Sequence, residues 1–267
     1  MSLPVPPRPD VGVGEGSGEG SGRPKATWSG LEGLGVWLIA NLVVGGVLVY
    51  SIFASFLDLD DVEGGADTDV LVVSAAIAVV TVALLWLWLR ARHPAWRAVM
   101  GIEGGRAGLR HAAWGAAAGL VLYPIVALGV GLVVVVILEA FASDPVETPD
   151  QLAPGLEGAG RLLAVAYGFV IAPIAEEFFF RGVLFRALAD RRGFWPGALI
   201  SGAIFGLVHL PIGEPFADAM VLPLVLSVTG VGLAWIYERR QSLLAPIAAH
   251  MVFNAIGLVL IFSGVGG

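Results

Sequence analysis

Residues 112–141 read AAWGAAAGLVLYPIVALGVGLVVVVILEAF and decide the fold, because their only charged side chain is Glu139, close to the end of the run. A helix that crosses a bilayer needs about 20 consecutive, mostly apolar residues. This run is long enough and apolar enough to form one. The sequence therefore predicts a membrane protein, and the search for further spans follows from this stretch.

Six further apolar runs accompany it, and 57% of the 267 residues are hydrophobic while 14% are charged. Soluble proteins average about 45–50% and about 25% respectively. We expect an all-α, polytopic bundle of about seven transmembrane helices. They lie near Leu34–Phe56, Val70–Leu89, Ala112–Phe141, Leu162–Leu188, Trp195–Leu210, Ala219–Tyr237 and Leu243–Phe262. The fifth of these runs is short for a span and the fourth is long.

The first 28 residues differ from the rest, since they are rich in Gly, Ser and Pro. Such a segment buries too little apolar surface to offset its ordering entropy. We expect residues 1–28 to form a disordered cytoplasmic tail and residues 29–267 to form the transmembrane domain.

The loops between the expected spans alternate in charge. Arginines gather at 90–110, 191–192 and 239–240, whereas residues 58–69 and 139–157 are acidic. Because cytoplasmic loops carry the Lys/Arg excess, we expect a cytoplasmic N-terminus. A net charge of −7 argues against a nucleic-acid partner, and the absence of Cys excludes a thiolate metal site.

The last four spans contain polar residues that are costly inside a membrane and therefore usually functional. Residues 172–188 read APIAEEFFFRGVLFRAL and hold Glu176, Glu177 and Arg181. The fifth span ends in SGAIFGLVHLP (201–211) with His209, and the seventh contains LLAPIAAHMVFNAIG (243–257), which holds a histidine and an asparagine one turn apart. The first three spans carry almost nothing comparable.

Helical spacing places some of these side chains on shared faces. Glu177 and Arg181 stand at i, i+4 and can form an ion pair, while Glu176 points about 100° away and is left for chemistry. His250 and Asn254 also stand at i, i+4 and can face one cavity. A depth count places His250 near the cytoplasmic edge of its span and His209 near the outer end of its own. The two can meet only if the fifth helix tilts, breaks or starts deeper.

Two kinds of chemistry suit this set. A carboxylate such as Glu176 can act as a general base towards water, while His or Asn N–H groups stabilise an oxyanion. Alternatively, His209, His250 and Glu176 could form a zinc site with an open position for water. Plainer interpretations are a structural Glu177–Arg181 pair and interhelical hydrogen bonding by His250 and Asn254.

Small residues at i, i+4 spacing have a simpler interpretation. Gly202 and Gly206, like Gly230 and Ala234, predict close helix contacts and no chemistry.

Three motifs in order make the sequence resemble the CPBP family of intramembrane endopeptidases, which comprises type II CAAX prenyl proteases and bacteriocin-processing (Abi) proteins. They are E-E-x-x-x-R from Glu176, F-x-x-x-H from Phe205 and H-x-x-x-N from His250. Flanking residues such as R-G-x-L-F-R and S-L-L-A-P-I-A-A-H agree as well. The resemblance covers roughly residues 165–257, and we expect a protease-like core at 160–262.

The resemblance implies an endopeptidase that cleaves a membrane-associated peptide or protein. Glu176 would activate water with help from His209, His250 and Asn254 would form the oxyanion site, and Glu177 with Arg181 would shape it. The family has been described both as glutamic and as metal-dependent, and two adjacent glutamates with only two histidines favour the glutamic version. No cofactor is firmly expected, and zinc is the one that the metal-dependent version would require.

Two other functions remain alternatives. A proton- or ion-coupled transporter could use the same acidic and imidazole groups, and a non-catalytic immunity or scaffold protein could keep the fold without turnover. The Gly-, Ala-, Val- and Arg-rich composition suggests a bacterial source, and therefore a multi-pass protein of the cytoplasmic (inner) membrane.

Overall fold

The computed structural model describes residues 24–55, 68–142, 144–147, 156–211 and 213–263. Almost all of the expected tail, residues 1–28, therefore lies outside the described residues. Within the described ranges the chain is helical and contains no strand. The predicted all-α class is confirmed.

The first half of the chain forms three long helical units. The first comprises α1 (Gly30–Leu38), the π-helix η1 (Ile39–Val49) and α2 (Tyr50–Phe53), and α3 (Thr68–Arg92) follows. The short α4 (Trp96–Met100) leads into α5 (Gly105–Tyr123), η2 (Pro124–Val130) and α6 (Gly131–Glu139). Pro124 has no backbone N–H to donate, and the helix changes from α to π geometry at that residue.

The second half begins with a long helical unit that carries the predicted site residues Glu176, Glu177 and Arg181. It consists of α7 (Gly158–Ala166), η3 (Tyr167–Ile171), α8 (Ala172–Glu177), η4 (Phe178–Phe185) and α9 (Arg186–Arg192). Then come α10 (Phe194–Leu207), α11 (Phe216–Arg240) and α12 (Leu244–Ser263).

Six helical stretches in the described part are long and apolar enough to cross a membrane, and Phe194–Leu207 is a shorter apolar helix. These stretches correspond to the seven predicted segments, so the polytopic helical bundle is confirmed. The 14 residues of α10 span about 21 Å, less than the roughly 30 Å hydrocarbon core. The fifth segment is thus short, as its sequence predicted.

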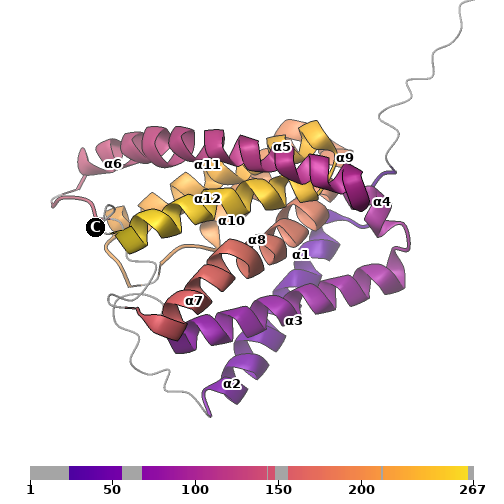
Figure 1. The fold of residues 1–267 in the computed structure, drawn as a ribbon, viewed down its shortest axis with the longest axis horizontal. Helices are drawn as coiled ribbons and strands as arrows, with labels where there is room; N and C mark the ends of the chain where they lie inside the picture. The colour runs from indigo at the N-terminus through magenta and orange to yellow at the C-terminus, as the bar shows by residue number, and fades with distance from the viewer. Residues whose placement is uncertain (1–23, 56–67, 143, 148–155, 212, 264–267) are drawn as a thin grey trace, which may run out of the picture.

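The unit from α7 to α9 runs through the middle of the bundle (Figure 1). On one side α7 and α8 pack against α3, and on the other side η3 and α8 pack against α12. Beyond α12 lies α5, while α10 packs on η4, α9 and α11. The helices that carry the predicted site residues therefore contact one another directly.

The core and the outer surface are both apolar, as expected for a protein in lipid. Buried aromatic rings from η4 (Phe178, Phe179, Phe180 and Phe185) pack with residues from several other helices. Leu42, Leu128 and Leu132, among many others, are exposed instead. So large an apolar surface would be unfavourable in water but suits contact with acyl chains.

Small residues allow α10 and α11 to approach closely. A Cβ atom added at Gly202 would lie 2.8 Å from the Ser227 carbonyl oxygen, and one added at Gly206 would collide with the Pro223 carbonyl. Gly230 faces Gly202 across the same contact, and Ala234 is buried. The prediction that these residues form helix contacts is confirmed.

The turn between α11 and α12 explains how His250 reaches the other site residues. Leu243 N–H donates to the Met100 carbonyl, and both residues lie against Gly182. Gly182 precedes the end of α9 by ten residues, about 15 Å along the helix. His250 lies seven residues after Leu243 in this turn, and Glu176 lies six residues before Gly182. Because this turn packs beside Gly182 and not beside the end of α9, the side chains of His250 and Glu176 lie at the same level. A count of residues along each span could not show this.

Candidate active site

Glu176 and Glu177 are neighbours in sequence but lie in different environments. Both belong to the last turn of α8, and their side chains diverge as helical geometry requires. The Glu177 side chain is fully buried, whereas that of Glu176 is 23% exposed. Only Glu176 therefore has direct access to a small molecule such as water.

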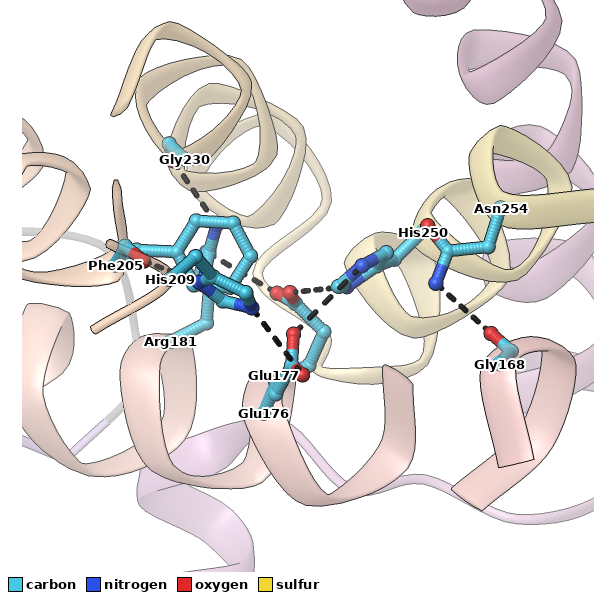
Figure 2. A network of polar contacts seen from close by, with 9 residues as sticks. All are labelled: Gly168, Glu176, Glu177, Arg181, Phe205, His209, Gly230, His250 and Asn254. Carbon is cyan, nitrogen blue, oxygen red and sulfur yellow. Dashed lines mark hydrogen bonds and ion pairs between the residues drawn. The ribbon is translucent and has the colours of Figure 1, made fainter. Parts of the chain in front are cut away.

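Glu177 joins two other predicted residues in a buried network (Figure 2). Its Oε2 lies 3.1 Å from Arg181 Nε, and its Oε1 lies 2.9 Å from His250 Nδ1. The expected ion pair is present, although the Arg181 N–H is not aligned along the N···O line as in a hydrogen bond. Arg181 Nη2 also donates to the Gly230 carbonyl at 3.2 Å, which ties η4 to α11.

Glu176 lies between two imidazole rings. His209 Nε2 is 3.8 Å from its Oε1, and His250 Nε2 is 3.8 Å from its Oε2. These separations exceed direct hydrogen-bond lengths and are short enough for a single water to bridge each pair. Each histidine thus faces a different oxygen of one carboxylate.

The other nitrogen of each imidazole is already bonded, and this fixes the orientation of both rings. His209 Nδ1 lies 2.7 Å from the Phe205 carbonyl oxygen, which can only accept, so Nδ1 carries the proton. His250 Nδ1 donates in the same way to the Glu177 carboxylate at 2.9 Å. At the Nε2 atom that faces Glu176, each neutral ring can accept a proton and each protonated ring can donate one.

The Phe205 ring packs against three of the predicted site residues. Its centroid lies 5.0 Å from that of His209, 5.8 Å from that of His250 and 4.8 Å from Arg181 Cζ. The ring is 1% exposed, so it fills the space between the arginine and the two imidazoles with apolar atoms.

Asn254 points to a different partner. Its Nδ2 donates to the Gly168 carbonyl of η3 at 2.8 Å, to one side of the Glu–His cluster (Figure 2). An amide nitrogen has two N–H groups, so this bond uses one of them. Asn254 therefore joins α12 to η3, which agrees with the interhelical hydrogen bonding suggested for this residue, although the H-x-x-x-N spacing did not identify its partner.

The arrangement of donors bears on the zinc alternative. Among the described residues, no group of three or more His, Asp or Glu side chains is arranged to hold a metal ion. His209 and His250 approach opposite oxygens of Glu176, and Glu177 is occupied by Arg181 and His250. In this arrangement the described residues do not fit a His₂Glu zinc site.

The network joins five of the six predicted site residues: Glu176, Glu177, Arg181, His209 and His250. The sixth, Asn254, follows His250 by one turn. The fold and this cluster define a multi-pass helical membrane protein with a carboxylate and two imidazoles grouped among its C-terminal helices.

Comparison with known proteins shows a family to which this part of the chain is similar. Residues 158–256 match the model of the type II CAAX prenyl endopeptidase Rce1-like family. The match covers all three motifs, and the resemblance to the CPBP group is confirmed.

Curated bacterial proteins are similar over the same part. The chain is 33% identical over 98 residues to "Putative membrane peptidase YdiL" of Bacillus subtilis, and the aligned part is 37% of each chain. It is 30% identical over 95 residues to an uncharacterized 24.3 kDa protein of Escherichia coli, covering 34% of this chain and 41% of that one. No solved structure matches. The chain thus spans less than half the length of these relatives.

Proposed function

We propose that this protein is an intramembrane endopeptidase that hydrolyses a peptide bond in a membrane-associated peptide or protein. The observation that carries the proposal is the Glu176 carboxylate, partly exposed and flanked at 3.8 Å by His209 and His250. An ionisable carboxylate among transmembrane helices is costly and usually has a functional role. The Rce1-like match over residues 158–256 supports the same reaction class.

In the proposed mechanism, Glu176 binds the attacking water and removes its proton as the oxygen adds to the peptide carbonyl. His209 lies close enough to share that water and to receive the proton at Nε2, since its Nδ1 is bonded to Phe205. The proton then passes to the amine that leaves when the C–N bond breaks. The acid and base roles need no group beyond these two residues.

The oxyanion that forms on the carbonyl requires donors. His250, when protonated at Nε2, and the second N–H of Asn254 are the proposed donors. Glu177 holds the His250 ring by its Nδ1, and Arg181 neutralises the Glu177 charge within the buried network. Glu177 and Arg181 thus orient the groups that react.

The metal-independent version of the mechanism is the one that we propose. The absence of a metal-compatible donor group among the described residues supports it, as does the engagement of Glu177 by Arg181. The two imidazoles then act on protons, and zinc has no part in the reaction.

The proposed setting is the cytoplasmic membrane of a bacterium, with the N-terminus inside. Six spanning helices support a multi-pass protein, and the similar curated proteins are bacterial. The substrate class follows from the position of the site: a peptide must reach helices that lie in the membrane.

The test is cleavage of a library of membrane-anchored peptides by purified protein in lipid vesicles. Glu176→Gln keeps the shape of the side chain and removes the base, and we expect at least a thousandfold loss of turnover. Glu103→Gln is the matched control, because Glu103 is 55% exposed and lies far along the chain from the motifs. The control should cleave at the wild-type rate.

The outcomes separate the alternatives. If Glu176→Gln cleaves as fast as the wild type, the proposed mechanism is wrong. If the wild type shows no cleavage but a pH-driven flux that Glu176→Gln abolishes, the protein is a transporter. If neither activity exists, the scaffold alternative gains support.

A further inference from the structure

The segment that leads into α1, together with the first turn of α1, is packed against the helical unit that carries Glu176 and Glu177. We call residues Pro24–Gly33 the N-terminal clasp. Trp28 of the clasp is fully buried, and its Nε1 donates to the Val183 carbonyl of η4 at 3.0 Å. That carbonyl also accepts the Arg186 N–H, so both of its lone pairs are used.

A second set of contacts joins the clasp to α9, one turn beyond η4. Ala26 N–H donates to Asp190 Oδ2 at 2.7 Å, and Arg186 Nη2 donates to the Pro24 carbonyl at 3.3 Å. Arg186 and Asp190 form an ion pair with each other at 2.9 Å. Because both side chains are buried, loss of the clasp would expose or strand this pair.

Glycines bring the clasp into direct contact with the same helix. A Cβ added at Gly33 would collide with Val183 Cγ1, and one added at Gly30 would lie 3.1 Å from Leu188 Cδ2. Val183 is therefore held by the Trp28 hydrogen bond on its carbonyl and by Gly33 against its side chain.

The position of Val183 makes this contact relevant to the site. The π-helix η4 begins at Phe178, directly after Glu177, and carries Arg181. π-helical stretches are rare and occur frequently at functional sites. A change of η4 to regular α-helix would rotate Glu176 and Glu177 relative to His209 and His250. Reacting groups that shift by about 1 Å can lose about a hundredfold in rate.

We infer that Trp28 is a positioning residue for the proposed peptidase reaction, acting through the Val183 carbonyl to hold η4 in π-helical geometry. The expected fall in kcat rests on the proposed function, whereas the effect of Trp28 on the geometry of η4 does not. Residues 24–33 lie outside the part of the chain that matches the Rce1-like model, which spans residues 158–256.

The first experiment uses full-length protein with Trp28→Phe, which keeps an aromatic ring and removes the indole N–H. We expect amide hydrogen exchange across residues 178–186 to rise about fivefold to tenfold, the effect of losing one hydrogen bond. The kcat should fall by a similar factor, with KM within twofold of wild type. Trp195→Phe is the control, because Trp195 is 65% exposed, and it should change neither quantity.

The second experiment tests the same contact by steric replacement. Gly33→Ala should push Val183 and raise exchange in η4 in the same way. Adding Val183→Ala removes the Cγ1 atom that the new methyl group meets, so the double variant should recover at least half of the lost kcat and protection. Rescue would show that the defect arises at the contact between residues 33 and 183, because a second core truncation elsewhere would add to the loss.

The inference is overturned if exchange across residues 178–186 is unchanged in both Trp28→Phe and Gly33→Ala. It is also overturned if kcat stays at the wild-type value while exchange rises. If the wild type cleaves no peptide, the proposed function fails, but the exchange measurement still decides whether the clasp holds η4.

Discussion

Replacing Glu177 by Gln removes the charge from a side chain whose two partners, Arg181 and His250, are both buried. Arg181 is 1% exposed, and its Nε lies 3.1 Å from the Glu177 carboxylate. Arg181 Nε faces Oε2 and His250 Nδ1 faces Oε1, and in Gln one of these two positions becomes an NH2 donor, so one of the two partners loses its acceptor. Removing one member of a buried ion pair costs about 3–5 kcal/mol, because the other charge is left uncompensated.

The neighbouring carboxylate gives a matched comparison. Glu176→Gln is the same chemical change, but this side chain is 23% exposed and its contacts at 3.8 Å are too long for direct hydrogen bonds. We expect its free energy of unfolding to change by less than about 1 kcal/mol. Glu176→Gln should thus abolish turnover in a stable protein, whereas Glu177→Gln should lower stability as well.

The assay is thermal unfolding of the detergent-solubilised protein at one fixed scan rate. A loss of about 3 kcal/mol in a chain of this size lowers the midpoint by roughly 6–12 °C. Adding Arg181→Met to Glu177→Gln removes the stranded charge, so the double variant should regain more than half of that loss. Equal midpoints for Glu176→Gln and Glu177→Gln, or additive losses in the double variant, would refute the reasoning.

Three further predictions concern packing, anchoring and metal. Gly206→Ala should lower the free energy of unfolding by about 1–3 kcal/mol, because the new Cβ collides with the Pro223 carbonyl. Gly257→Ala is the control: nothing lies near its Cβ position, so the same thermal assay should find it neutral or stabilising. Asn254→Ala should lower the free energy of unfolding by about 1–2 kcal/mol, because the hydrogen bond to Gly168 is lost, and it should also reduce turnover. If this variant keeps full activity, Asn254 is not part of the oxyanion site. Treatment with a chelator should leave cleavage unchanged, and elemental analysis should find zinc far below one ion per chain; a chelator-sensitive activity restored by zinc would contradict the glutamic mechanism.

The bundle and the candidate residues could be predicted from local sequence. Runs of about 20 apolar residues specify membrane helices on their own, because the backbone must satisfy its hydrogen bonds within each segment. The i, i+4 spacing likewise predicted the Glu177–Arg181 pair and the divergence of Glu176, because helical geometry alone determines them.

The relative height of the helices could not be predicted in this way. The residue count placed His250 and His209 at opposite ends of their spans, whereas the α11–α12 turn packs on Met100 and Gly182 and so brings His250 to Glu176. The bond from Asn254 to Gly168 and the clasp around Val183 also join residues at least 86 positions apart.

By itself the sequence determined that the chain crosses a membrane as helices and which polar side chains are unusual there, since both follow from the cost of placing polar groups in hydrocarbon. Only the tertiary structure decided which carboxylate is buried in an ion pair, which faces the two imidazoles, and which distant segment holds the helix that carries them. Those features depend on the position of each helix, along its axis, relative to its neighbours. Side-chain packing between helices sets that position, and the sequence of a single segment does not determine it.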